Sequence, residues 1–106
     1  MKVSPTQRSL EHMRKQGYTC QVVERWNQFA RVRQDLFGFI DIVCLGPNGE
    51  TVGVQATSHS NVSSRVNKIA ESEHVGAIRK CGWRLLVQGW GKRANGRYEL
   101  REVDVS

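Results

Sequence analysis

Asp41 is the residue of this sequence whose surroundings most strongly indicate chemistry. It lies inside the apolar run 39–45 (FIDIVCL), with an isoleucine on either side. Burying a carboxylate in such a run is unfavourable unless the group is paired, hydrogen-bonded or bound to a cation. Asp41 is therefore either a metal ligand or a buried carboxylate that is satisfied by backbone amides or by an arginine.

Two polar side chains are expected to lie beside Asp41. In residues 51–57, polar and apolar positions alternate, so Gln55 and Thr57 point to the same face of a strand. A type I turn centred on Asn48, followed by a bulge at Gly49, would place Asp41 directly opposite Gln55, with their Cβ atoms about 5 Å apart. This polar patch depends on the register, because a slip of one residue would separate its members.

The elements that must position this patch can be read from the remaining sequence. The segment 46–49 (GPNG) is typical of a turn, since proline presets φ and asparagine and glycine accept a positive φ. Ser4 and Pro5 form a helix start, and Gly17 is a typical helix end. The apolar run 39–45 predicts a strand near the centre of a sheet, covered on both faces.

The order of elements predicts an α/β fold of the type α-β-β-β-α-β-β, a mixed β-sheet flanked by helices. The segment 25–36 has no clean period and is interpreted as a functional loop or a short irregular helix. The expected elements are a helix over 4–17, strands over 18–24, 39–45 and 51–57, a helix from about 61 that breaks and continues over 71–80, and strands over 83–90 and 98–105, the last at a sheet edge.

Length and composition limit the class of protein. The 106 residues are 39% hydrophobic and 25% charged, which predicts a single domain over 1–106. No apolar run reaches the roughly 20 residues that cross a bilayer, and the N-terminus lacks an apolar signal core. The 3 cysteines contain no C-x-x-C pair and are interpreted as reduced thiols. We therefore expect no membrane partner and a location in the cytoplasm, bacterial or that of a host cell if the protein is viral.

The charge indicates an anionic partner. Lys and Arg number 16 against 10 Asp and Glu, a formal net charge of +6. A small basic domain is a candidate for nucleic-acid binding, although a basic surface can also serve solubility alone. The basic residues expected to contact nucleic acid lie on loops and on the second helix: Arg31, Arg33, Arg65, Lys92 and Arg93.

The tryptophans are interpreted differently. Trp26, Trp83 and Trp90 are expected to be core residues more often than platforms for base stacking. Trp90 is the one candidate for base stacking, because two glycines flank it and the basic pair Lys92 and Arg93 follows it.

The pattern of elements around Asp41 resembles the PD-(D/E)xK nuclease core over roughly residues 5–90. Within that superfamily it is most similar to archaeal Holliday-junction resolvases and to small virus-type replication-repair nucleases. Asp41 falls on the metal-binding Asp of the family, with Ile40 in place of the usual Pro. The segment 55–57 (QAT) falls on the E-x-K segment, and Glu11 falls where the resolvases carry an acidic residue on the first helix.

The resemblance implies a restriction-endonuclease-like sheet and a hard divalent cation, Mg²⁺ or Mn²⁺. The side chains of Asp41 and Gln55 and the backbone carbonyl of Ala56 would hold this cation. Gln55 and Thr57 depart from the family pattern, since the glutamine is neutral and the threonine replaces the family's lysine. Lys68 could supply the positive charge that is missing at Thr57. It shares a helix face with Arg65, and a solvated helix face is an equally good interpretation of that pair.

The resemblance thus implies a metal-dependent DNA endonuclease of resolvase type, and it also implies a homodimer, since two cuts on a branched DNA need two sites. Its expected catalytic residues are Asp41, Gln55, Thr57, Lys68 and Glu11. The alternative is a catalytically inactive nuclease-fold protein that binds nucleic acid or a protein partner. A third option is a structural or inhibitory phage protein that uses the fold as a scaffold.

Overall fold

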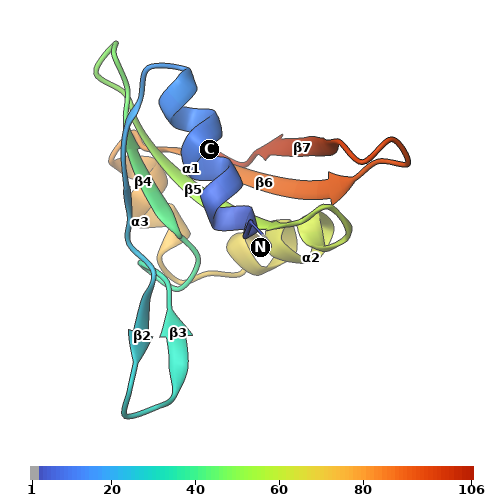
Figure 1. The fold of residues 1–106 in the computed structure, drawn as a ribbon. Coiled ribbons are helices and arrows are strands. Elements are labelled where there is room, and N and C mark those ends of the chain that lie inside the picture. The colour runs from blue at the N-terminus through green and yellow to red at the C-terminus, as the bar shows by residue number, and fades with distance from the viewer. Residues whose placement is uncertain (1–2) are drawn as a thin grey trace.

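A computed structural model describes residues 3–106, and its elements form a five-stranded mixed sheet with helices on both faces and a separate two-stranded hairpin (Figure 1). The elements in chain order are α1 (Pro5–Lys15), β1 (Thr19–Val22), β2 (Arg25–Asn27), β3 (Val32–Gln34), β4 (Ile42–Leu45), β5 (Thr51–Ser58), the short 3₁₀ helix η1 (His59–Asn61), α2 (Val62–Ala70), α3 (Val75–Lys80), β6 (Arg84–Lys92) and β7 (Tyr98–Asp104).

The main sheet has the strand order β1-β4-β5-β6-β7. Strands β5 and β6 pair in parallel, and the other neighbouring pairs are antiparallel. The parallel pair needs a crossover, and η1, α2 and α3 supply it. These features confirm the predicted α/β class, the mixed sheet and the edge position of 98–105, which is β7.

Two hydrophobic layers hold the helices against the sheet. Leu10 and Met13 of α1 pack on one face, and residues of α2 and α3 such as Ile69 and Ile78 pack on the other. Gly89 of β6 lets α2 approach closely, because a Cβ at this position would lie 2.2 Å from a methyl carbon of Val62. The sheet is therefore covered on both sides.

The predicted start and end of the first helix are confirmed. The Ser4 side chain accepts a hydrogen bond from the backbone N–H of Gln7 at 3.2 Å, and Pro5 occupies the first turn, where a missing N–H costs nothing. Gly17 ends the helix with a φ of +94°. The helix is thereby fixed in length before β1 begins.

The turn between β4 and β5 also agrees with the prediction. The strands pair with Leu45 opposite Thr51 and Ile42 opposite Val54, a register centred on Asn48. Gly49 has a φ of +88°, as the predicted bulge requires.

Two predicted elements differ from the structure. The segment 25–36, expected to be a loop or irregular helix, contains the antiparallel hairpin β2–β3. The Asn27 side chain closes its turn by accepting hydrogen bonds from the N–H groups of Phe29 and Ala30, at 3.0 and 3.1 Å. The strand expected over 39–45 starts only at Ile42, because residues 36–40 form a tight loop in which Leu36 and Ile40 bond to each other.

The helical crossover breaks after Ala70 as predicted, but the second helix begins only at Val75, so residues 71–74, expected to be helical, form a turn. The part of the chain that the structure describes holds no helix that is both long and apolar enough to cross a bilayer.

Candidate functional site

The backbone of Asp41 is held from two sides at the start of β4. Its N–H donates to the carbonyl of Val54 at 2.8 Å, and its carbonyl accepts from the N–H groups of Val23 and Glu24, at 2.8 and 3.3 Å. The residue is 3% exposed. Asp41 therefore bridges the end of β1 and the central strand β5, and its carboxylate has little freedom.

The carboxylate of Asp41 lies against the part of β5 that extends beyond β4. Oδ2 accepts a hydrogen bond from the backbone N–H of Ala56 at 2.8 Å and a second from Nε2 of Gln55 at 2.9 Å. The predicted juxtaposition of Asp41 and Gln55 is confirmed, and the hydrogen bond from the backbone amide is compatible with either interpretation of Asp41. Thr57 follows two residues later on the same face of β5 and is 5% exposed.

Two further carboxylates join Asp41, and sequence reasoning did not find them. One oxygen from each of Glu24, Asp35 and Asp41 lies within 4.8 Å of the others. We call these three residues the carboxylate cluster. Glu24 directly precedes β2, and Asp35 directly follows β3, so the β2–β3 hairpin has one cluster member at each end.

The loop 36–40 explains how Asp35 reaches Asp41. Leu36 and Ile40 exchange backbone hydrogen bonds of 2.9 and 3.0 Å, which sets Asp35 and Asp41 side by side across the antiparallel bridge. The reversal needs positive φ values at Phe37 (54°) and Gly38 (85°). The only sequence signal for this arrangement was the glycine.

Burial and neighbouring charge make the cluster hold a proton near neutral pH. The pKa of Asp41 is raised to about 8, chiefly because its carboxyl is buried, and further because it hydrogen-bonds to Asp35 and faces the charges of Asp35 and Glu24. The N–H of Ala56 acts in the opposite direction. A cation bound here would relieve the same repulsion and displace the proton.

The side-chain amide of Gln55 is a second buried polar group at this site, and its hydrogen bonding is incomplete. Its side chain is 3% exposed, and its Oε1 is buried without a hydrogen-bond partner among residues 3–106. A buried amide oxygen left in this way is uncommon in folded proteins and points to a water or an ion. The oxygen belongs to the same carboxamide whose nitrogen bonds to Asp41.

The cation nearest to the cluster by direct contact is Arg33. Its guanidinium forms an ion pair of 2.8 Å with Glu24, and its side chain is 72% exposed. The predicted nucleic-acid contact Arg33 therefore lies at the rim of the carboxylate cluster, with most of its surface open to a ligand.

Neither Glu11 nor Lys68 forms a described hydrogen bond or ion pair with the carboxylate cluster among residues 3–106. Glu11 is exposed on α1 and lines a hollow with Arg8, Trp90 and Tyr98, and the structure does not bring it into the carboxylate cluster. Lys68 is exposed on α2 and lines a different hollow, beside Phe39 and residues 72–74. No described hydrogen bond or ion pair links Lys68 to Asp41.

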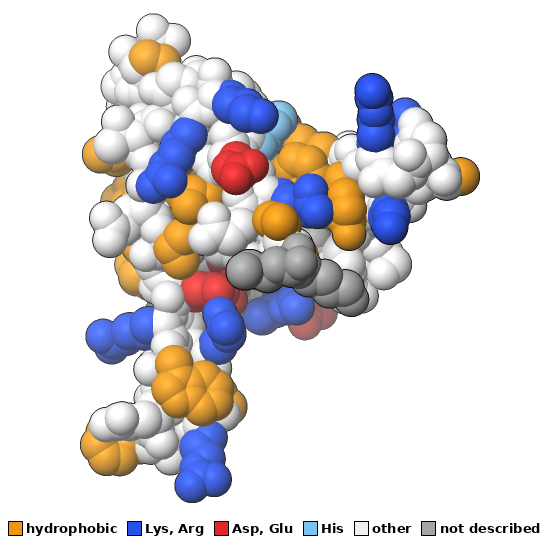
Figure 2. Space-filling model, in the orientation of Figure 1, with side chains coloured by type: hydrophobic (Ala, Val, Ile, Leu, Met, Phe, Trp, Pro, Cys, Tyr) orange, Lys and Arg blue, Asp and Glu red, His pale blue; other side chains and the backbone are white. Residues whose placement is uncertain are grey.

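The other predicted basic contacts are distributed over the surface. Arg31 is exposed in the turn of the β2–β3 hairpin, with a φ of 54°. Lys92 ends β6, and Arg93 follows it and pairs with Glu99 at 3.2 Å. Arg65 is partly buried on α2. Figure 2 shows Lys and Arg side chains on both projecting hairpins and over α1.

The expectation for Trp26 was wrong. Its side chain is 60% exposed on β2, because the short hairpin stands away from the sheet and has no layer to cover it (Figure 1). Trp90 is partly buried, and its indole N–H donates to the Ser9 hydroxyl at 2.8 Å.

No family model, curated protein or solved structure matches this chain.

Proposed function

We propose that this protein is a divalent-metal-dependent nuclease that acts on DNA. The carboxylate cluster carries the proposal: Glu24, Asp35 and Asp41 place three acidic oxygens within 4.8 Å of one another. Burial and the mutual repulsion of these carboxylates disfavour the fully charged cluster without a cation, and both raise the pKa of Asp41. The basic surface supplies the attraction for a polyanion.

The donor set fits a hard cation such as Mg²⁺ or Mn²⁺. Carboxylate and amide oxygens are the ligands these ions prefer, and the cluster offers carboxylates from Glu24, Asp35 and Asp41. Gln55 is a candidate fourth donor, because turning its carboxamide over would direct Oε1 toward Asp41 in place of the nitrogen. When bound, the cation would activate water and stabilise the charge that develops on the phosphate.

The protein's own residues prepare this site. The N–H of Ala56 fixes Oδ2 of Asp41, so the carboxylate keeps its orientation whether or not it is protonated. Because N–H and C=O of one strand residue point to the same side, the Ala56 carbonyl also faces this edge of β5. Asp41, with its carboxylate buried and fixed by the Ala56 N–H, would lose its proton when it holds the cation.

The arrangement also suits the resemblance to the PD-(D/E)xK core. Asp41 and Gln55 stand where that core has its Asp and the acidic residue of E-x-K. Glu24 and Asp35 would compensate for the charge missing at Gln55. Arg33, in contact with Glu24, is the best-placed substitute for the lysine missing at Thr57, ahead of Lys68. A branched DNA substrate and a homodimer belong to this proposal.

The decisive experiment compares cleavage of linear duplex, single-stranded and four-way-junction DNA in Mg²⁺, Mn²⁺ and EDTA. We expect cleavage with a metal and none in EDTA. Glu24→Gln should reduce the rate at least about tenfold, since it removes a cluster carboxylate. Glu11→Gln is the matched control, because it makes the same change on α1, outside the cluster, and should leave the rate within about twofold.

One observation favours a second candidate, an inactive nuclease-fold protein that binds nucleic acid or a protein. Thr57 is buried and cannot carry a charge, and no lysine among residues 3–106 bonds to the cluster. If the wild type binds Mn²⁺ and DNA but cuts none of the three substrates, this candidate replaces the nuclease.

A further inference from the structure

The β2–β3 hairpin exposes large hydrophobic side chains. Trp26 is 60% exposed, Phe29 93% and Val32 49%. Figure 1 shows the hairpin standing clear of the sheet and its helices, so none of these side chains contributes to the core layers. Exposed aromatic residues concentrated in one short projecting element indicate a contact surface.

The same hairpin is strongly basic. Residues 25–34 contain Arg25, Arg31 and Arg33 and no acidic residue. Trp26 and Arg33 are direct partners across the two strands and therefore share one face of the hairpin. A flat aromatic surface beside a guanidinium matches a nucleotide, which offers a base to stack and a phosphate to pair.

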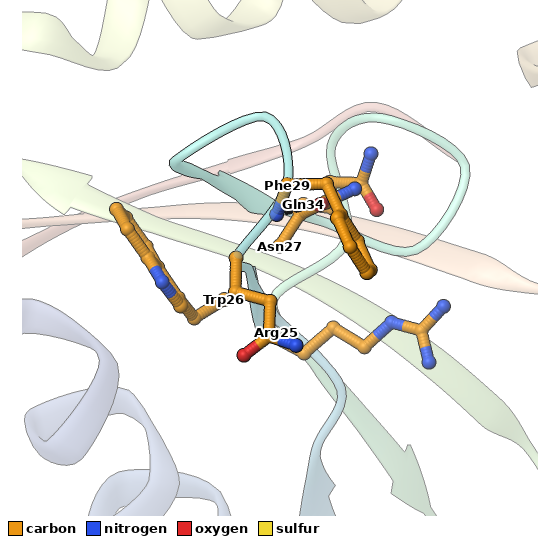
Figure 3. Close-up of a pocket in the computed structure, with 6 residues that line it drawn as sticks. Arg25, Trp26, Asn27, Phe29 and Gln34 are labelled. Carbon is orange, nitrogen blue, oxygen red and sulfur yellow. Dashed lines mark hydrogen bonds between the residues drawn. The ribbon is translucent and has the colours of Figure 1, made fainter.

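Beside Trp26, the hairpin forms an open hollow of about 300 Å³, lined by Arg25, Trp26, Asn27, Gln28, Phe29 and Gln34. Figure 3 shows Arg25 and Phe29 on one side of the hairpin and Trp26 on the other. The amides of Asn27 and Gln34 add hydrogen-bonding groups of the kind that contact base edges.

The hairpin is joined directly to the carboxylate cluster. Glu24 and Asp35 are the residues at its two ends, and Trp26 follows Glu24 by two residues, about 7 Å along a strand. A base stacked on Trp26 would therefore bring its neighbouring phosphate close to Glu24. Arg33, which pairs with Glu24, would lie between the two.

We propose that the β2–β3 hairpin binds unpaired nucleotides of a DNA strand, with a base stacked on Trp26 and phosphates held by its arginines, next to the carboxylate cluster. This inference rests on the proposed nuclease function and specifies its substrate as DNA with unpaired nucleotides, a single strand or a branch point. Paired bases are excluded from such stacking, because their faces are already covered in the duplex.

The test measures binding in EDTA, so that no cleavage occurs, by the fluorescence anisotropy of a labelled oligothymidine and of a duplex of the same length. We expect wild type to prefer the single strand. Trp26→Ala should weaken single-strand binding about tenfold and duplex binding less than twofold, whereas Trp26→Phe should retain most of the affinity.

Two controls isolate the hairpin. Leu45→Ala removes another exposed hydrophobic side chain, 54% exposed at the far end of β4, and should not change binding. Lys80→Ala removes an exposed positive charge at the end of α3 and should have less effect than Arg31→Ala. Unchanged thermal unfolding would show that the exposed substitutions leave the fold intact.

The inference is overturned if wild type does not prefer the single strand, or if Trp26→Ala behaves like Leu45→Ala. It is also overturned if Trp26→Ala converts a dimer to a monomer in sedimentation without altering DNA binding, since the hairpin would then be a contact between copies. Metal-dependent cleavage of single-stranded DNA at the wild-type rate by Trp26→Ala, with no loss of single-strand affinity, would refute this inference alone. Intact strand binding without any cleavage would refute the nuclease alone.

Discussion

At the scale of single residues, Asp41 shows how one buried carboxylate can respond to both protons and metal. The burial that raises its pKa to about 8 also disfavours the ionised form that a metal requires. A cation must therefore compete with a proton at neutral pH, and metal affinity should increase as the pH rises toward 8 and above.

Asp41→Asn provides the first prediction. Because the folded-state pKa of Asp41 lies above its unfolded value of 3.8, the protonated carboxyl favours the folded state fully below pH 4, and this contribution is lost as the pH rises through about 8. In EDTA, the unfolding temperature of wild type should therefore fall relative to that of Asp41→Asn as the pH rises across this window. Parallel curves for the two proteins would contradict the assigned pKa.

The same variant should lose metal binding. Asparagine can still accept the hydrogen bond from Ala56, but it removes the charge at the centre of the carboxylate cluster. We expect the Mn²⁺ affinity, measured by calorimetry, to fall at least about tenfold and cleavage to be abolished, while metal-free DNA binding is unchanged or slightly tighter.

Gln55→Glu is the second prediction, and it tests the buried amide oxygen. The new carboxylate would face Asp41, so the metal-free protein should unfold at a lower temperature, and Mn²⁺ should bind more tightly and restore stability. Gln88→Glu is the matched control. Gln88 is also buried with an unpartnered Oε1, but its amide bonds to Glu102, away from the cluster. It should be destabilised without recovering on metal addition, and equal recovery in both variants would argue against a role for Gln55.

At the scale of elements, short-range signals predicted much of the fold. Ser4 and Pro5 start a helix by local hydrogen bonding, and Pro47 and Gly49 set a turn whose geometry alone fixes the register of β4 and β5. The pairing of Asp41 with Gln55 followed from that register. Each of these steps depends on residues that are close in sequence.

The carboxylate cluster could not be predicted in the same way. Glu24 and Asp35 are separated by a hairpin with strands of 3 residues, too short for a periodic pattern, and the loop 36–40 requires a positive φ at Phe37, which phenylalanine seldom adopts. The exposure of Trp26 was missed for a related reason, since nothing in the sequence tells an uncovered hairpin from a covered one.

Gly38→Ala is the prediction that belongs to this scale. Gly38 has a φ of +85° and open space around it, so alanine should cost about 1 kcal/mol of backbone strain without a steric clash. If the loop positions Asp35, the substitution should also weaken Mn²⁺ binding several-fold. Gly96→Ala introduces the same strain, at φ +85° and also in open space, in the β6–β7 turn. It should lower stability alike and leave metal affinity unchanged, and an equal loss of affinity in both variants would count against the loop's role.

At the scale of the whole molecule, two basic hairpins project from the body of the protein (Figure 1). The β2–β3 hairpin carries Arg31 and Arg33, and the β6–β7 hairpin carries Lys92 and Arg93. Their contributions should differ, because Arg93 is paired with Glu99 and Arg33 with Glu24, whereas Arg31 and Lys92 form no ion pair in the described chain. The unpaired cations are the ones free to displace counterions from phosphates.

The salt dependence of DNA binding measures this division of charge. Each phosphate that a cation neutralises on a single strand adds about −0.7 to the slope of log affinity against log salt concentration. Arg31→Ala and Lys92→Ala should each make the slope shallower by about that amount. Arg93→Ala should change it less, since its guanidinium is partly satisfied by Glu99, and Lys80→Ala should leave it unchanged if α3 faces away from the DNA. A wild-type affinity that stays flat from low to physiological salt would mean that the net charge of +6 does not serve a nucleic acid, and a protein partner would then be the better explanation of both hairpins.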